Sequence, residues 1–506
     1  MIEEILELGI LVDELDSNMM SQRVNETNLD LIKKIEDCYK SIRGEKLAND
    51  EVIPLMYTES NYYALLMRIA QEDFDKVKSY SIKLKKFDDF ANAAIEIKVE
   101  RIRLYRQALD LHQSGGSAIT PEYMAQISTN LGNLYHEMGR IVESIEVLSK
   151  TFADVNEFPM ALGNHGLKLY TLATYPISNE IQKYLINSAL EDLNSMLEKA
   201  CESDSISVEH ISLFEEWKSS IESSLVNLSE VNAWEASSDV DHSYKNWCAK
   251  KRLSLNYINI VSDQGNVDNI HIPNMGISYF NEDNGKMTYY SWFNTIKQEF
   301  NLSRYNMYLI DKSESDLHES QQFNVLINTS DYPALGYKTE LLKTALRAAY
   351  GILDKIGLFC SHFFRVKTKP GRIDFNKWYK EVEMEVALDS PFNALYWLSN
   401  DLDFRTGYFK DIRRLRNVIE HRYLRVLDYY KVPISEELED TDKYEYTVGY
   451  QELYSITMDT LNLVRSAIFY MVNGFNVLYK NAVYGNQEGK IFLPLYLDVY
   501  DDEWKN

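Results

Sequence analysis

Near its C-terminal end the sequence contains the segment Arg413-Arg414-Leu415-Arg416-Asn417-Val418-Ile419-Glu420-His421-Arg422. Apolar residues recur through and beyond this segment three and four positions apart, at Ile412, Leu415, Ile419, Tyr423, Val426 and Tyr430. This spacing places apolar side chains on one face of a helix. We therefore predict a helix over Asp411–Tyr430 with a buried apolar stripe and a basic outer face.

Long helical patterns precede and follow this segment. Leu342, Ala345, Ala349, Leu353, Ile356 and Cys360 predict a helix from Lys338 to about Phe364, ended by the stretch Lys367–Gly371. A similar pattern predicts a last helix over Tyr450–Lys480, and Pro391–Leu402 suits a short helix. Together these patterns predict an all-α helical bundle over residues 336–506.

The N-terminal half is also predicted to be helical, with a repeat. Ala93–Leu111 has the pattern of a surface helix, and the chain breaks after it at Gln113–Ser117. The stretch Asn130-Leu131-Gly132-Asn133-Leu134-Tyr135 resembles the first helix of a tetratricopeptide repeat, and Asn164 and Gly166 follow Asn130 and Gly132 by 34 residues. We predict tetratricopeptide-like (TPR-like) repeats in an N-terminal domain, residues 1–230, which would offer a face to a protein partner. The alternative is an ordinary helical bundle with a chance Leu-Gly pair.

Residues 231–335 differ in composition, being rich in Ser, Asn, Asp and Tyr. Leu253–Ile260 has strand-like character, Ser291–Phe300 suits a helix, and Asp311–Gln322 suits a surface loop. We predict a connector of irregular and mixed structure. The expected fold class is therefore all-α, with TPR-like helical repeats followed by the C-terminal bundle.

Composition limits the possible functions. The net charge of −24 argues against nucleic-acid binding over the whole surface, but Arg405–Arg425 contains seven Lys/Arg and two Asp/Glu, a local balance of 7 − 2 = +5. The four cysteines form no CxxC pair, the N-terminus lacks the basic start of a signal peptide, and no apolar run approaches membrane-spanning length. We expect a cytoplasmic protein without a membrane segment, and we expect neither a metal site nor a cofactor.

The basic segment has the groups needed to cleave RNA without a metal. Asn417 and His421 are four residues apart and therefore share a helix face, and Arg416 is adjacent. A histidine can exchange the proton of a ribose 2′-hydroxyl near neutral pH, and an arginine can bind the phosphate. Cleavage needs both an acid and a base, or a second electrostatic group, and two copies of the chain meeting at a two-fold axis would provide them.

The pattern Arg416-Asn417-x-x-x-His421 resembles the R-N-x-x-x-H motif of HEPN domains. Several further stretches resemble a bacterial HEPN subfamily that follows TPR-like repeats: Trp247-Cys248, Arg252–Asn256, Ala394–Ser399 and Asp501–Lys505. The resemblance implies a helical-bundle homodimer and a metal-independent endoribonuclease that leaves 2′,3′-cyclic phosphates, often acting as a toxin or in antiviral defence. Other members of this family only bind.

The resemblance assigns roles to individual residues. His421 would be the general acid or base, Arg416 would bind the phosphate and Asn417 would orient these groups. RNA would contact Arg413, Arg414, Arg422 and Arg425, although these arginines could equally form a solvated face. Other hypotheses are a non-catalytic interaction or nucleotide-binding protein, and a plain salt-bridged helix surface of Arg416 and His421 with Glu420. His362 suits a core or interface position better than catalysis. Walker, Rossmann and serine-hydrolase motifs are absent from the sequence.

Overall fold

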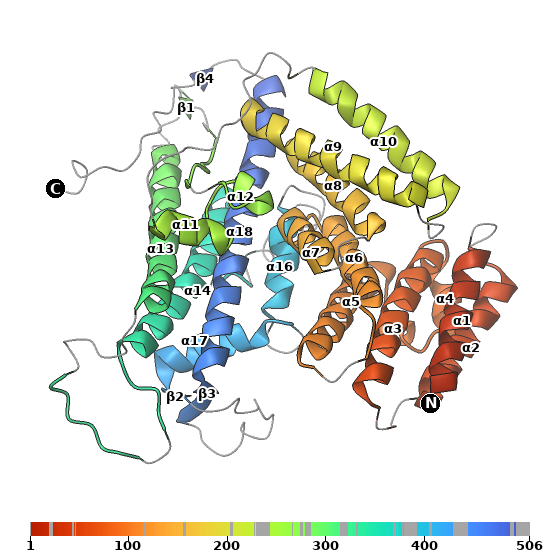
Figure 1. Cartoon of the computed structure of the whole chain (residues 1–506), viewed down its shortest axis with the longest axis horizontal. Helices are drawn as coiled ribbons and strands as arrows, with labels where there is room; N and C mark the ends of the chain where they lie inside the picture. The colour runs from red at the N-terminus through yellow and green to blue at the C-terminus, as the bar shows by residue number, and fades with distance from the viewer. Residues whose placement is uncertain are drawn as a thin grey trace. The chain divides into compact units, whose positions relative to one another are not determined.

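The structure is a computed structural model in which helices predominate (Figure 1). It describes residues 2–19, 24–42, 45, 47–115, 118–154, 158–202, 206–226, 228, 243–265, 267–273, 277–278, 285–313, 322–329, 332–367, 371, 373–376, 378, 392–403, 407–428, 444–485 and 490–491. Two compact units can be distinguished. Unit 1 comprises Met1–Glu137, Glu143–Lys168 and Ala189–Ser220, and unit 2 comprises Met138–Val142, Leu169–Ser188 and Ile221–Asn506.

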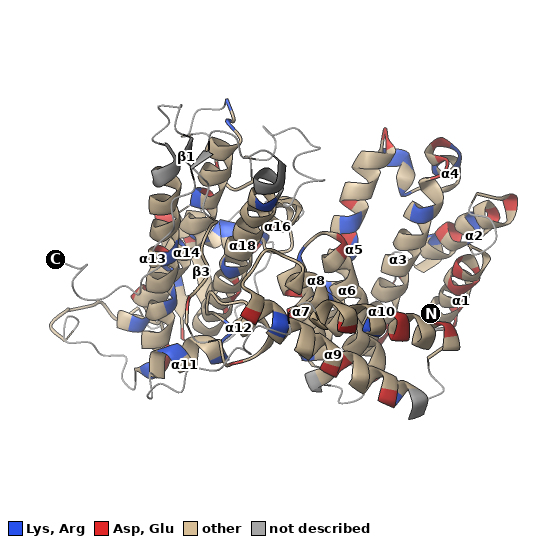
Figure 2. Cartoon of the chain, turned by 90° about the horizontal axis from the view of Figure 1, so that it is seen from above, with Lys and Arg blue, Asp and Glu red and all other residues tan. Residues whose placement is uncertain are grey.

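Unit 1 begins with a compact group of helices. These are α1 (Ile2–Asn18), α2 (Glu26–Ile42), α3 (Asn49–Ala70), α4 (Phe74–Tyr80), the 3-10 turn η1 (Leu84–Lys86) and α5 (Phe90–Gln113). Their apolar faces form one core that includes Leu15, Ile32, Leu66 and Ile97. The first of these helices is acidic, because α1 has six Asp/Glu and no Lys or Arg (Figure 2). The helix predicted over Ala93–Leu111 is confirmed within α5.

The predicted repeat region consists of successive helices: α6 (Pro121–Glu137), α7 (Ile141–Asp154), α8 (Pro159–Ala173), α9 (Asn179–Glu202) and α10 (Val208–Val226). The two glycines that are 34 residues apart lie at close helix contacts. A Cβ on Gly132 would lie 2.9 Å from Cγ of Leu148 on α7, and a Cβ on Gly166 would lie 2.8 Å from the carbonyl oxygen of Ala189 on α9. The glycines therefore permit close packing between neighbouring helices. This geometry agrees with the reason for expecting glycine there, and the assignment to TPR repeats stays a prediction.

A buried histidine links three helices in the same region. His165 lies on α8, and its Nδ1 is 2.6 Å from Oδ2 of Asp192 on α9. Its Nε2 is 2.9 Å from Oγ of Ser149 on α7. With Nδ1 protonated, the ring donates to the carboxylate and accepts from the serine hydroxyl. All polar atoms of the imidazole thus have partners in the packed helices.

In unit 2, the long helices α13 (Gly285–Lys312), α14 (Tyr337–Phe363) and α18 (Tyr450–Gly485) pack against one another. Shorter helices complete the unit: α11 (Ser243–Lys250), α12 (Ile258–Val261), α16 (Asn393–Asp401) and α17 (Lys410–His421). Helix α16 contacts α18, and α17 contacts both α14 and α18. The long helices predicted over Lys338–Phe364 and Tyr450–Lys480 are confirmed, as is the short helix within Pro391–Leu402. The first long helix ends at Phe363, where Arg365 adopts a φ of +54°, before the predicted stop at Lys367–Gly371.

The region expected to be a connector differs from the prediction. The helix expected over Ser291–Phe300 extends over the 28 residues of α13, and residues 314–321 of the expected loop lie outside the described residues. The strand expected over Leu253–Ile260 is wrong, because this stretch forms turns followed by α12. Its asparagines bond to the backbone: Asn259 Oδ1 accepts from the Ser254 amide at 3.0 Å, and Asn256 Oδ1 accepts from the Ile258 amide at 2.9 Å. Such local bonds stabilise turns instead of a strand ladder. The boundaries at residues 230 and 335 stay a prediction.

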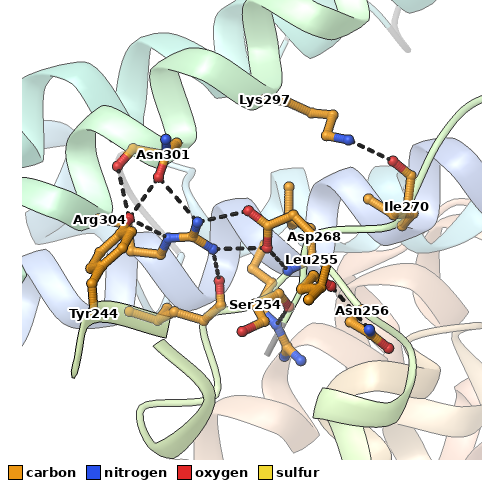
Figure 3. Close-up of polar contacts among 12 residues, drawn as sticks. Tyr244, Ser254, Leu255, Asn256, Asp268, Ile270, Lys297, Asn301 and Arg304 are labelled. Carbon is orange, nitrogen blue, oxygen red and sulfur yellow. Dashed lines mark hydrogen bonds and ion pairs between the residues drawn. The ribbon is translucent and has the colours of Figure 1, made fainter. Parts of the chain in front are cut away.

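An ion pair between the buried Arg304 and the partly exposed Asp268 joins this stretch to α13 (Figure 3). The Arg304 guanidinium donates to both carboxylate oxygens of Asp268, at 3.0 and 2.7 Å, and to the Leu253 carbonyl at 2.7 Å. Asp268 also accepts from the Leu255 amide at 2.7 Å. Burial alone would raise the pKa of Asp268, but the charge and hydrogen bonds of Arg304 lower it below its ordinary value. Residues 253–268 are therefore an integral part of unit 2.

Strands are few in the described part of the chain. β1 (Ile277–Ser278) pairs antiparallel with β4 (Lys490–Ile491), and β2 (Tyr423–Leu427) pairs parallel with β3 (Glu445–Gly449). Among the described residues, no helix combines the length and the apolar character that a membrane span requires. The terminal stretch Asp501–Lys505 lies outside the described residues.

Candidate functional site

The basic segment forms α17, which is anchored at its start and along its apolar face. At its start, the Phe409 amide donates to the Asp401 carbonyl at 2.7 Å. The Asp401 carboxylate is itself fixed within unit 2 by a buried ion pair with Arg140 at 2.7 Å. Along the helix, Ile412, Leu415 and Val418 are buried. The sequence thus produces a short helix whose polar face is held in a defined orientation.

The end of α17 corrects the prediction of a helix to Tyr430. The helix ends at His421, Arg422 is extended with φ −141° and ψ 174°, and residues 423–427 form β2. Tyr423, expected in the buried stripe, has 78% of its surface exposed. The alternating Tyr-Leu-Arg-Val-Leu sequence suits a strand as well as a helix, and pairing with β3 decides between them. Tyr430 lies outside the described residues.

Arg416 makes three contacts, two with residues of α14 and one with its neighbour on α17. Its Nη2 donates to Asp354 Oδ2 at 3.0 Å, and its Nη1 donates to Asn417 Oδ1 at 3.0 Å. The guanidinium carbon lies 5.0 Å from the centre of the Tyr350 ring. The side chain nevertheless remains 31% exposed. These contacts fix the plane of the guanidinium and leave part of it open to a ligand.

Asp354 is a site residue that the sequence analysis missed. Besides bonding Arg416, its Oδ1 accepts from the Phe375 amide at 3.2 Å. This backbone comes close because position 357 on α14 is glycine, where a Cβ would lie 3.1 Å from Cα of Phe375. Burial raises the pKa of Asp354 above its ordinary value, although the Phe375 amide and the Arg416 charge oppose this shift. The pair therefore joins a partly desolvated carboxylate to a cation at the candidate site.

Asn417 and His421 lie four residues apart on one face of α17, as predicted. His421 is the last residue of the helix and is exposed. In the described part of the chain, its side chain makes no hydrogen bond or ion pair. The alternative in which Glu420 forms an ion-paired surface with Arg416 does not match the geometry, because Glu420 lies 3.8 Å from Arg347 and Arg416 pairs with Asp354. The structure thus brings Arg416 and Asn417 into contact and leaves the His421 imidazole accessible.

The four arginines predicted to contact RNA have different environments. Arg413 lies 3.7 Å from Asp374, Arg414 lies over the Tyr446 ring at 4.7 Å, and Arg425 pairs with Glu445 at 3.2 Å. Arg422, in contrast, lines a hollow between α14 and the end of α17. Of the four, it is therefore the best placed to bind an anion.

Other candidate groups offer less. The His362 ring lies 2.8 Å from the Tyr289 hydroxyl and packs edge-on against Trp292. The residue is exposed, so a core position is wrong, and an interface position stays a prediction. Among the described residues, no group of three or more His, Cys, Asp or Glu side chains could hold a metal ion.

Comparison with known proteins adds one finding. No curated protein and no solved structure matched the chain. Residues 280–477 match the family model described as LA2681-like HEPN. This range begins just before α13 and includes α14, α17 and most of α18, and therefore all three residues of the candidate site. This mostly helical chain thus has a HEPN domain in its C-terminal part, which suggests a nuclease or nucleotide-related role.

Proposed function

We propose that the protein is a metal-independent endoribonuclease that acts as a dimer through its HEPN domain. The observation that supports the proposal most is the arrangement of α17. Arg416 is held in place by Asp354 at 3.0 Å and remains partly exposed, while His421, five residues later, is exposed at the helix end. A fixed cation and an accessible imidazole on the same short helix suit the cleavage of a phosphodiester.

In this mechanism the ribose 2′-oxygen attacks the adjoining phosphorus and the bond to the 5′-oxygen breaks. The products are a 2′,3′-cyclic phosphate and a 5′-hydroxyl. One His421 takes the proton of the 2′-hydroxyl, and a second His421, from another copy of the chain, protonates the leaving 5′-oxygen. Arg416 stabilises the negative charge that builds on the phosphate, and Asn417 orients the Arg416 guanidinium through its side-chain oxygen.

The remaining parts of the chain fit a regulated enzyme of this kind. The successive helices α6–α10 would bind a partner or target, and a toxin or antiviral-defence setting would explain why the nuclease is fused to such a scaffold. These roles follow from the proposed nuclease and do not support it independently.

A pair of histidine variants tests the proposal. We expect His421→Ala to lower RNA cleavage at least about 100-fold, because general acid–base groups contribute about 10²–10⁴-fold. The control is His210→Ala, which removes an exposed histidine of α10 and should cleave like the wild type. Light scattering after gel filtration should give the same dimer mass for all three proteins. Wild-type activity in His421→Ala would refute the assignment.

A further inference from the structure

Beside the motif, a hollow of about 260 Å³ lies between the first half of α14 and the chain that leaves α17. Its lining combines three cations with one carboxylate: Lys343, Arg347, Arg422 and Glu340. Thr344 contributes a hydroxyl, and Tyr423 forms part of the rim. The balance of 3 − 1 = +2 on these residues contrasts with the −24 of the whole chain.

The charges of the hollow are only partly satisfied within the chain. Lys343 pairs with Glu340 at 2.9 Å, and Arg347 lies 3.8 Å from Glu420, with half of its side chain exposed. Arg422 is exposed, and its side chain makes no hydrogen bond or ion pair within the described ranges. An arginine without a partner beside two loosely paired cations is suited to bind a phosphate group.

The adjoining aromatic residue adds a second kind of contact. Tyr423 directly follows Arg422, and 78% of its surface is exposed, which is unusual for a residue of this size on a strand. Nucleic-acid bases stack on exposed aromatic rings when they are not already stacked in a duplex. Cations and an open ring together match the phosphate and base of a single-stranded nucleotide.

The position of the hollow relates it to the candidate site. On α14, Arg347 and Lys343 lie 7 and 11 residues before Asp354, which holds Arg416. At about 1.5 Å per residue, these positions are roughly 10 and 17 Å from the Arg416 anchor. Arg422, which lines the hollow, directly follows His421, so the hollow borders the histidine itself. A strand cleaved at His421 could therefore continue into the hollow.

We propose that this hollow is a binding subsite for single-stranded RNA next to His421. Tyr423 stacks on a base, and Lys343, Arg347 and Arg422 bind the adjoining phosphate. The proposal rests on the proposed nuclease function for its link to cleavage, and it predicts binding that does not depend on catalysis.

The experiment measures binding by fluorescence anisotropy with a labelled, unstructured RNA of about 12 nucleotides, using the His421→Ala background so that the RNA stays intact. We expect Tyr423→Ala to weaken binding about 5–10-fold, the lower part of the range for one stacked base, and Tyr423→Phe to bind normally. Arg422→Gln should weaken binding by a similar factor. It should also make the dependence of the logarithm of the RNA association constant on the logarithm of the salt concentration less steep by about 0.7, because one phosphate contact is lost.

Two matched controls use the same unit. Lys355→Gln removes another α14 lysine that is paired with a glutamate, Glu299, and Phe323→Ala removes another exposed aromatic ring. Both should bind RNA like the parent, and a fully duplex RNA should be insensitive to Tyr423→Ala. Because Arg422 and Tyr423 are exposed, their substitution should leave the thermal unfolding curve unchanged.

The outcomes separate the two proposals. Unchanged binding by Tyr423→Ala and Arg422→Gln would overturn the subsite, even if the wild type cleaves RNA. Weakened binding by these variants, together with no cleavage by the wild type, would retain the subsite and refute the nuclease. An absence of RNA binding by the parent would also overturn the subsite.

Discussion

The ion pair between Asp354 and Arg416 provides the sharpest test of how the site is organised. In Asp354→Asn the side chain keeps one oxygen, which can accept from the Phe375 amide or from Arg416. The second oxygen is replaced by an NH2 group, which cannot accept, and the negative charge is lost. Hydrogen bonds to charged groups contribute about 1.5–3 kcal/mol and neutral ones about 0.5–1.5 kcal/mol. The substitution should therefore weaken the interaction that orients Arg416 by about 1 kcal/mol. Expressed in the transition state, this loss makes cleavage about fivefold slower.

The effect should appear in the rate and not in the affinity. Removing a negative charge close to the bound phosphate does not weaken RNA binding, so we expect Asp354→Asn to lower kcat about fivefold and to bind RNA at least as well as the wild type. Single-turnover cleavage measures the first quantity, and anisotropy in the His421→Ala background measures the second. The control is Asp374→Asn, since Asp374 faces Arg413 at 3.7 Å and not Arg416. Unchanged cleavage by Asp354→Asn, or an equal loss in the control, would refute this role.

Three further predictions concern stability. Burial, together with the nearby Lys168 charge, lowers the pKa of His136 from 6.5 to about 4. Between these pH values the unfolded chain binds more protons than the folded chain, so unit 1 should lose stability as the pH falls from 6.5 towards 4. His136→Gln should flatten this pH dependence in thermal unfolding scans. Asp268→Ala should destabilise unit 2 by about 3 kcal/mol in urea unfolding, because it leaves the buried Arg304 charge without its counterion. Gly166→Ala should destabilise unit 1 by about 1–2 kcal/mol through its clash with a backbone oxygen, whereas Gly9→Ala, which has no atom within 4 Å, should stabilise it by up to about 1 kcal/mol. A flat pH profile of wild-type stability would contradict the argument on His136. An unchanged urea midpoint in Asp268→Ala would contradict the role of the ion pair, and equal effects of the two glycine substitutions would contradict the packing argument.

Helical periodicity predicted the elements whose fold depends on local sequence. The long amphipathic patterns of α14 and α18 were identified nearly to their ends, because each repeats its apolar face over several turns. In α13 the same periodicity is obscured by Tyr, Ser and Asn, and only Ser291–Phe300 of its 28 residues was predicted. Its other turns are stabilised by packing on α14, which single-sequence patterns do not reveal.

The parts that depend on distant partners could not be predicted. β2 forms because β3, about 20 residues later, supplies a ladder, so the helical spacing of Tyr423 and Val426 was misleading. At the site, Arg416, Asn417 and His421 were identified from their chemistry and spacing. Asp354 gave no signal, because it pairs with Arg416 across 62 residues. Lys343 and Arg347 likewise resemble ordinary helix-surface cations until α14 is placed beside α17.

The most direct test of the central claim is an RNA cleavage assay in EDTA that compares the wild type with His421→Ala and identifies the chemical ends of the products. Total tRNA and a structured messenger would serve as substrates. Our account predicts cleavage by the wild type alone, with 2′,3′-cyclic phosphate and 5′-hydroxyl ends. Cleavage that His421→Ala retains, or that EDTA abolishes, would contradict it.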